Sequence, residues 1–277
     1  MTWETFGHDN VKAILEKQLK HKVFPHAYLF HGPSGVGKKK LALEFAKKVL
    51  ETENLSSHPD FLSLDSSGQI TMEATREFIS RLGLKPFAGK YKVAILNDAE
   101  NLSSQSANAL LKTLEEPAEN TIIILISSSS RLLSTILSRC QAFSFNAFSK
   151  ARLSEFAKRE KLEISEEILE LSYGSISILN KIVADKDFFS LRKEAVEEYK
   201  SLIKAKSGER LARLSEIAEN ENEELEEKFK DWLSWQLAAL HKNPGDYLKV
   251  QALSEALSGL KKNLNKKLVL QSLLLKI

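Results

Sequence analysis

The chain has 277 residues, of which 43% are hydrophobic and 28% are charged, and its formal net charge is +3. These values are typical of a globular protein with room for two or three domains. The small net charge argues against a dedicated nucleic-acid binder, and the single cysteine excludes an internal disulfide framework and a four-cysteine zinc site within the chain. The first residues form no secretory leader, and no apolar run reaches the roughly 18 residues of a membrane span. We therefore expect a cytoplasmic protein.

A glycine-rich stretch matches the phosphate-binding loop G-x-x-x-x-G-K-[ST] in all but its last position. The loop's glycines let backbone N–H groups face phosphate oxygens, and its lysine reaches the terminal phosphates. The candidate phosphate-binding residues are Gly32, Gly35, Gly37 and Lys38. The last position normally places a hydroxyl on Mg²⁺, whereas Lys39 carries an ammonium that cannot coordinate a metal. The loop thus predicts an ATPase frame with a damaged metal site, and we expect no metal ligands.

The segments around this loop support its assignment. Residues 27–30 are apolar and predict a buried strand that enters the loop, and apolar residues at helical spacing over 41–50 predict the helix that leaves it. A strand, a glycine loop and a helix in this order are the context that a phosphate-binding loop requires. The alternative is a plain glycine turn before a helix.

A second apolar strand, residues 91–96, ends in Asn97-Asp98. In nucleoside triphosphatases one carboxylate at this place holds Mg²⁺ and the next orients the attacking water. Asn97 falls at the metal-holding position and Asp98 at the water-activating position. Two alternatives stay open: a shift of one residue would restore the metal-holding Asp, or Asp98 caps the helix that follows.

The stretch Ser103–Pro117 predicts an amphipathic helix that Pro117 ends. Its sequence, Gln-Ser-Ala-Asn-Ala-Leu-Leu-Lys-Thr-Leu-Glu-Glu-Pro from position 105, resembles the signature of AAA+ clamp-loader subunits of bacterial DNA polymerase III. Further along, residues 122–126 predict a buried strand. The resemblance places Ser127, at the end of that strand, at the sensor 1 position beside the nucleotide, and the alternative is a loop serine.

A second motif of the same family is Ser138-Arg139-Cys140. The resemblance implies that Arg139 is an arginine finger, which enters the ATP site of the neighbouring subunit and stabilises charge on the transferred phosphoryl group. The alternative is a surface arginine that precedes a buried strand at 143–145. We expect Cys140 to be a buried, small apolar side chain.

Beyond residue 147 the pattern is helical. Three short apolar-faced segments between 148 and 184 resemble the family's helical lid, and Ser177 stands where active members place the sensor 2 arginine. Amphipathic segments fill residues 185–277, and the ending 263–275 resembles the family's oligomerisation collar. We therefore predict an α/β AAA+ P-loop domain with a parallel sheet (1–147), a helical lid (148–184) and an all-α collar (185–277).

The family resemblance covers the whole chain and implies a role in DNA replication. Lys39, Asn97 and Ser177 each replace a group that ATP hydrolysis needs, which favours the delta prime type of subunit, with no ATPase activity of its own. The implied partners are motor (gamma/tau) and delta subunits in a hetero-pentamer, the sliding clamp and primed DNA. No cofactor is required, weak ATP or ADP binding is allowed, and the family's zinc module is absent.

The resemblance also implies that DNA phosphates lie against the start of the helix after Leu102. The candidate DNA-contacting residues are Ser103, Ser104, Asn108 and Lys112, and such contacts are independent of base sequence. Two other functions stay open. One is a gamma/tau-type subunit that hydrolyses ATP, and the other is an AAA+ DNA-repair or branch-migration motor.

Overall fold

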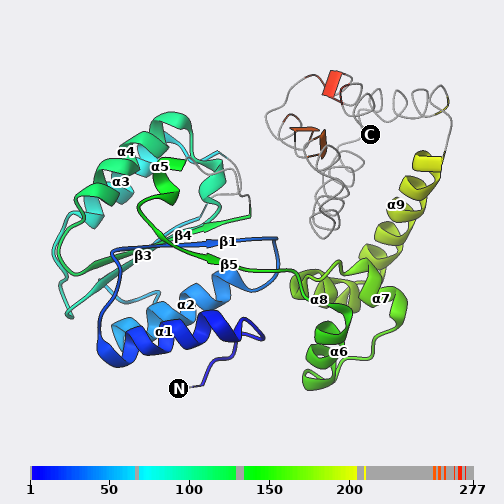
Figure 1. Cartoon of the computed structure of the whole chain (residues 1–277), viewed down its shortest axis with the longest axis horizontal. Helices are drawn as coiled ribbons and strands as arrows, with labels where there is room; N and C mark the ends of the chain where they lie inside the picture. Colours follow the sequence, from blue (N-terminus) through cyan, green and yellow to red (C-terminus); the bar gives the residue numbers. More distant parts are fainter. Residues whose placement is uncertain are drawn as a thin grey trace. The chain divides into compact units, whose positions relative to one another are not determined.

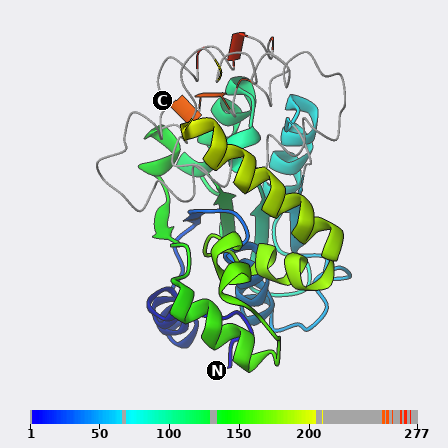
Figure 2. The same cartoon turned by 90° about the vertical axis from the view of Figure 1, so that its right-hand side faces the viewer.

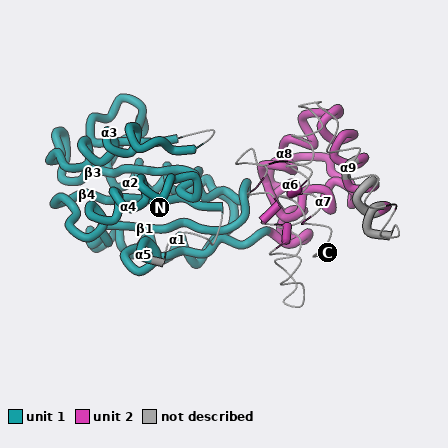
Figure 3. Tube along the Cα trace, turned by 90° about the horizontal axis from the view of Figure 1, so that it is seen from above, with its two compact units in different colours: residues 1–147 teal, residues 148–277 magenta. Residues whose placement is uncertain are grey.

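The computed structural model describes residues 2–65, 69–128 and 134–204, with isolated positions beyond 204. The chain forms two compact units, Met1–Ala147 and Phe148–Ile277, coloured teal and magenta in Figure 3. Among the described residues, no helix is long and apolar enough to cross a membrane.

Unit 1 is built on a five-stranded sheet in the order β2-β3-β4-β1-β5, and every pair of neighbouring strands is parallel. The strands are β1 (Ala27–His31), β2 (Phe61–Leu64), β3 (Lys92–Leu96), β4 (Thr121–Ser127) and β5 (Gln141–Ser144). The central strands are continuous apolar runs because both faces of a parallel sheet are covered; all seven residues of β4 are buried. The predicted parallel α/β domain is confirmed.

Helices cover both faces of this sheet (Figures 1 and 2). On one face lie α1 (Asp9–His21) and α2 (Lys38–Leu50), and Tyr28 of β1 packs against Phe45 of α2 with ring centroids 5.4 Å apart. On the other face lie α3 (Met72–Leu82), α4 (Ser104–Glu115) and the short α5 (Ser134–Leu137). Their core members include Phe78, Leu110 and Ile136, which pack with alternate residues of the strands. A short 3-10 helix, η1 (Ala99–Asn101), follows β3.

Unit 2 begins with three short helices, α6 (Lys150–Arg159), α7 (Glu166–Leu171) and α8 (Ile176–Ala184). Each has a serine N-cap, Ser149, Ser165 or Ser175, whose hydroxyl accepts a backbone N–H from three residues ahead. The longer α9 (Lys186–Lys204) follows after Asp185. These helices match the predicted segments. The amphipathic segments predicted beyond residue 204, including the ending 263–275, lie outside the described residues, apart from isolated positions.

Candidate functional site

The glycine loop between β1 and α2 has the backbone that its sequence requires. Gly32, Gly35 and Gly37 have φ angles of 140°, 74° and 101°, in the region that favours glycine. A Cβ on Gly32 would collide with the backbone carbonyl of Phe145, which follows β5. The loop is therefore held between β1 and the segment after β5, and α2 starts directly after Gly37.

Lys38 folds back onto this loop. Its Nζ donates to the carbonyl oxygens of Gly32 and Pro33, each at 2.6 Å, and the side chain is buried. Burial lowers the pKa of the Lys38 ammonium to about 8, against the opposing attraction of Glu100 and Asp98. The lysine expected to reach phosphates is thus bonded to its own loop.

Lys39 occupies the position of the missing metal-binding hydroxyl. Its Nζ lies 2.7 Å from Oδ1 of Asp65, which follows β2, and both side chains are about half exposed. A cation paired in this way supplies no ligand oxygen for Mg²⁺. Among the described residues there is also no group of three or more His, Cys, Asp or Glu side chains that could hold a metal ion.

The acidic end of β3 lies near the same loop. Nδ2 of Asn97 donates to Oδ2 of Asp98 at 2.9 Å, and Asp98 has a left-handed backbone with φ of 51°. Asp98 occupies the N-cap position of η1, but its side chain makes no capping hydrogen bond. An amide thus stands beside a carboxylate at the end of β3.

The sequence interpretation missed Glu100. Its Oε1 accepts hydrogen bonds from the backbone N–H of Ser128, at 3.0 Å, and from the Ser128 hydroxyl. Its Oε2 is buried and has no hydrogen-bond partner among the described residues. The sequence signal that could have indicated this role is an acidic residue shortly after the apolar strand. Glu100 ties the end of β3 to the end of β4.

Ser127 is the last residue of β4 and is fully buried, so the loop alternative is wrong. It pairs with His31 in the sheet, and its carbonyl oxygen accepts the N–H of Gly32 at 3.2 Å. The structure therefore brings Gly32, Lys38, Asp98 and Ser127 together at the carboxyl edge of the sheet. This edge is where ligands bind in open α/β sheets.

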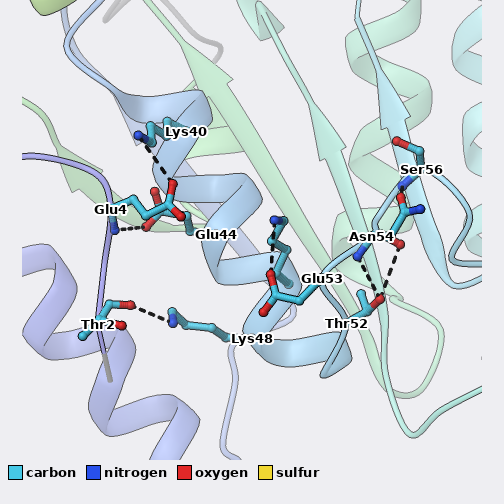
Figure 4. A network of polar contacts seen from close by, with 10 residues as sticks. Thr2, Glu4, Lys40, Glu44, Lys48, Thr52, Glu53, Asn54 and Ser56 are labelled. Atoms are coloured by element: carbon cyan, nitrogen blue, oxygen red, sulfur yellow. Dashed lines mark hydrogen bonds and ion pairs between the residues drawn. The ribbon is translucent and has the colours of Figure 1, made fainter.

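The first residues of the chain lie along α2 (Figure 4). The N–H of Glu4 donates to Glu44 at 3.1 Å, and Nζ of Lys48 donates to the carbonyl oxygen of Thr2 at 3.0 Å. A few residues later, Nε2 of His8 donates to the carbonyl oxygen of Val36 in the glycine loop at 2.7 Å, and burial lowers the pKa of His8. The N-terminal segment thus fastens the loop and its helix, a role that the sequence did not indicate.

The candidate DNA-contacting residues lie at one end and along one face of α4. Ser103 is the N-cap, and its hydroxyl accepts the N–H of Ser106 at 3.1 Å. Ser104, Asn108 and Lys112 are exposed at intervals of four residues, which places them on the same helix face. Three of the four side chains are therefore open to a ligand, whereas the Ser103 hydroxyl is engaged in the cap.

Arg139 lies just after α5, and its side chain is 31% exposed. Its NH1 donates to the carbonyl oxygen of Thr135 at 2.7 Å and to the Ser138 hydroxyl at 3.2 Å. Its NH2 lies 2.5 Å from Oε1 of Glu115, the last residue of α4. The guanidinium is thus at the surface of unit 1 and held by α4 and α5. In unit 2, Ser177 is exposed in the first turn of α8.

Cys140 is partly buried and packs against the core of unit 1, so the expected buried, small apolar side chain is confirmed in part. Burial raises the pKa of its thiol to about 11. The thiol is therefore protonated near neutral pH and is a weak nucleophile.

Comparisons with known proteins identify the family. Residues 7–149, more than half of the chain, match the family model described as DNA polymerase III, delta subunit. DNA polymerase III subunit tau/gamma of Haemophilus influenzae is 32% identical over 169 residues, which cover 55% of this chain and 25% of that protein. DNA polymerase III subunit delta' of Pseudomonas aeruginosa is 32% identical over 203 residues, 65% of this chain and 62% of that protein. The chain therefore spans less than two thirds of these relatives.

A solved structure supports the fold. The RuvB Holliday junction branch migration motor of Thermotoga maritima superposes with a TM-score of 0.50 over 96% of this chain and 88% of that chain. The sequence identity is 18%, so this likeness shows the fold alone. Taken with the sequence relatives, the family match assigns the chain: it belongs to the DNA polymerase III delta-subunit family.

Proposed function

We propose that this chain is a delta prime-type subunit of the clamp loader, which places the sliding clamp on primed DNA and hydrolyses no ATP itself. The observation that carries the proposal is the contrast between the glycine loop and Arg139. In the loop, Lys38 is bonded to Gly32 and Pro33, and Lys39 is paired with Asp65. Arg139 is also paired, with Glu115, but it lies at the surface of unit 1 and its guanidinium carries five N–H donors in a fork that can bind phosphate oxygens.

In this proposal Arg139 completes the ATP site of a neighbouring motor subunit. A guanidinium supplied in trans stabilises charge on the transferred phosphoryl group, which an amine cannot do with the same two-pronged geometry. Residues 148–184 would form the lid and residues 185–277 the collar that joins the pentamer. Ser104, Asn108 and Lys112 would face DNA phosphates inside the pentamer, and the protein would act in the cytoplasm.

The second candidate is a gamma/tau-type subunit that hydrolyses ATP. The retained glycines of the loop and Lys38 favour it, and tau/gamma proteins are among the relatives. It requires Mg²⁺-dependent nucleotide binding, which the Lys39 ammonium and the Asn97 amide disfavour.

The test is to titrate the purified chain with ATP and ADP, with and without Mg²⁺, and to measure phosphate release. We expect no measurable turnover and no gain in nucleotide affinity when Mg²⁺ is added. Lys39→Thr should not restore hydrolysis, because Asn97 and Ser177 remain. Sustained Mg²⁺-dependent turnover by the unmodified chain would falsify the delta prime assignment.

A further inference from the structure

The contacts of Arg139 include one carboxylate, Glu115, that can fix the direction of its guanidinium. NH1 of the guanidinium donates two hydrogen bonds. One goes to the Thr135 carbonyl on α5, and the other goes to the Ser138 hydroxyl between α5 and β5. The only charged partner among its contacts in the described part of the chain is Glu115, which accepts from NH2 at 2.5 Å. We propose that Glu115 is a positioning residue for Arg139, which aims the guanidinium for use in the neighbouring ATP site; this inference rests on the proposed function.

The position of Glu115 in its helix supports this role. Glu115 is the last residue of α4. The partial negative charge at a helix C-terminus disfavours a carboxylate there, so helix stability does not account for this residue. Its neighbour Glu116 carries the same charge and is exposed as well. The feature that distinguishes Glu115 is therefore its contact with Arg139.

The ion pair with Glu115 can orient the Arg139 side chain and still release it to phosphate. An arginine side chain is long and flexible, and contacts on two helices fix its plane and direction before phosphate arrives. Glu115 is 48% exposed and Arg139 31% exposed, so water and salt weaken their attraction. Phosphate oxygens can then bind the guanidinium in place of the carboxylate, because charge-assisted hydrogen bonds to phosphate are strong. A carboxylate in this setting orients the finger instead of restraining it.

The test uses the reconstituted clamp loader with the full chain, saturating clamp and primed DNA, and ATP as the variable substrate. Glu115→Ala removes the partner at a helix position where alanine is well tolerated. We expect the part of DNA-stimulated ATP hydrolysis that depends on Arg139 to fall about three-fold in kcat, the scale of an exposed ion pair, with KM for ATP unchanged. Glu115→Gln keeps an acceptor oxygen and should lose less. Glu116→Ala is the matched control and should behave as the unmodified chain.

The same variants in an Arg139→Ala background separate the possible outcomes. Glu115→Ala should then have no further effect, because the residue that it positions is gone. If Arg139→Ala lowers hydrolysis but Glu115→Ala does not, the positioning role is wrong and the trans role of Arg139 stands. A rise in kcat with Glu115→Ala, or a loss that persists without Arg139, also overturns it. If Arg139→Ala itself changes nothing, the proposed function and this inference both fail.

Discussion

Lys38 is buried, and its ammonium is bonded to its own glycine loop, whereas the sequence motif predicts that it contacts phosphates. Its folded pKa of about 8 lies below the ordinary value of 10.5. Between these pH values the unfolded chain keeps the proton that the folded chain has lost, so stability rises with pH there. Below about pH 8 both states hold the proton, and the folded state bears the full cost of a buried charge.

We therefore predict that the unmodified chain gains stability relative to Lys38→Met as pH rises from about 8 to 10.5. The gain is on the order of 3 kcal/mol. The measurement is urea unfolding of both proteins across this pH range, since groups common to both proteins cancel in the difference. A difference that does not change with pH would show that the ammonium is not buried as described.

Asp60 is a second buried charge, and it organises the loop before β3. Its carboxylate accepts the N–H groups of Phe87 and Ala88 at 2.5 and 2.7 Å and that of Gly89 at 3.1 Å. Burial alone would raise its pKa, but these three bonds favour the charged form more strongly, and the net pKa is lowered. The stability that Asp60 contributes is present above the ordinary carboxylate pKa and is lost as pH falls through the lowered value.

Asp60→Ala should lower the free energy of unfolding by about 2–3 kcal/mol, because three N–H groups lose a charged acceptor. Asp65→Ala is the control: it removes an exposed partner of Lys39, and we expect a change of at most about 1 kcal/mol. Chemical denaturation at neutral pH measures both. Equal losses for the two variants would contradict the role of burial at Asp60.

At the scale of elements, α4 combines a core face with a candidate DNA face. Ala107, Leu110 and Leu114 are buried against the sheet, whereas Ser104, Asn108 and Lys112 are exposed on the other side. A lysine that contacts a DNA phosphate releases bound counterions, so its loss weakens binding and reduces the salt dependence.

We predict that Lys112→Ala weakens binding of the reconstituted loader to primed DNA equally for different sequences and reduces the log–log salt slope by about 1. Lys20→Ala, on α1 at the opposite face of the sheet, should leave both quantities unchanged. Fluorescence anisotropy titrations at several salt concentrations give the slope. An unchanged slope for Lys112→Ala would remove this residue from the DNA surface.

The sequence predicted β1, β3, β4, α2 and α4 of unit 1 because their signals are local. Continuous apolar runs marked β1, β3 and β4, and the glycine loop fixed the connection between β1 and α2. What it could not show are contacts between residues far apart in the chain, such as Glu100 with Ser128 and Arg139 with Glu115. Those contacts arise from strand order and side-chain direction, which no single segment encodes.

At the scale of the whole molecule, the proposal separates two tasks. Unit 1 would present Arg139 to a neighbour, and the segment from residue 185 would hold the chain in the pentamer. We predict that a chain of residues 1–184 fails to enter the reconstituted complex, because its collar segment is missing. Size-exclusion chromatography with the motor and delta subunits decides this. Entry of the shortened chain as efficient as that of the full chain would contradict the collar assignment.

In the proposed function, the chemistry of this chain takes place in the ATP site of another subunit. Its most direct test is DNA-stimulated ATP hydrolysis and clamp loading by pentamers that carry Arg139→Ala or Arg139→Lys. We expect intact assembly, a loss on the order of 10³-fold at the site that Arg139 completes, impaired clamp loading, and little recovery with lysine. Hydrolysis and loading at the unmodified rates in an intact Arg139→Ala pentamer would contradict it.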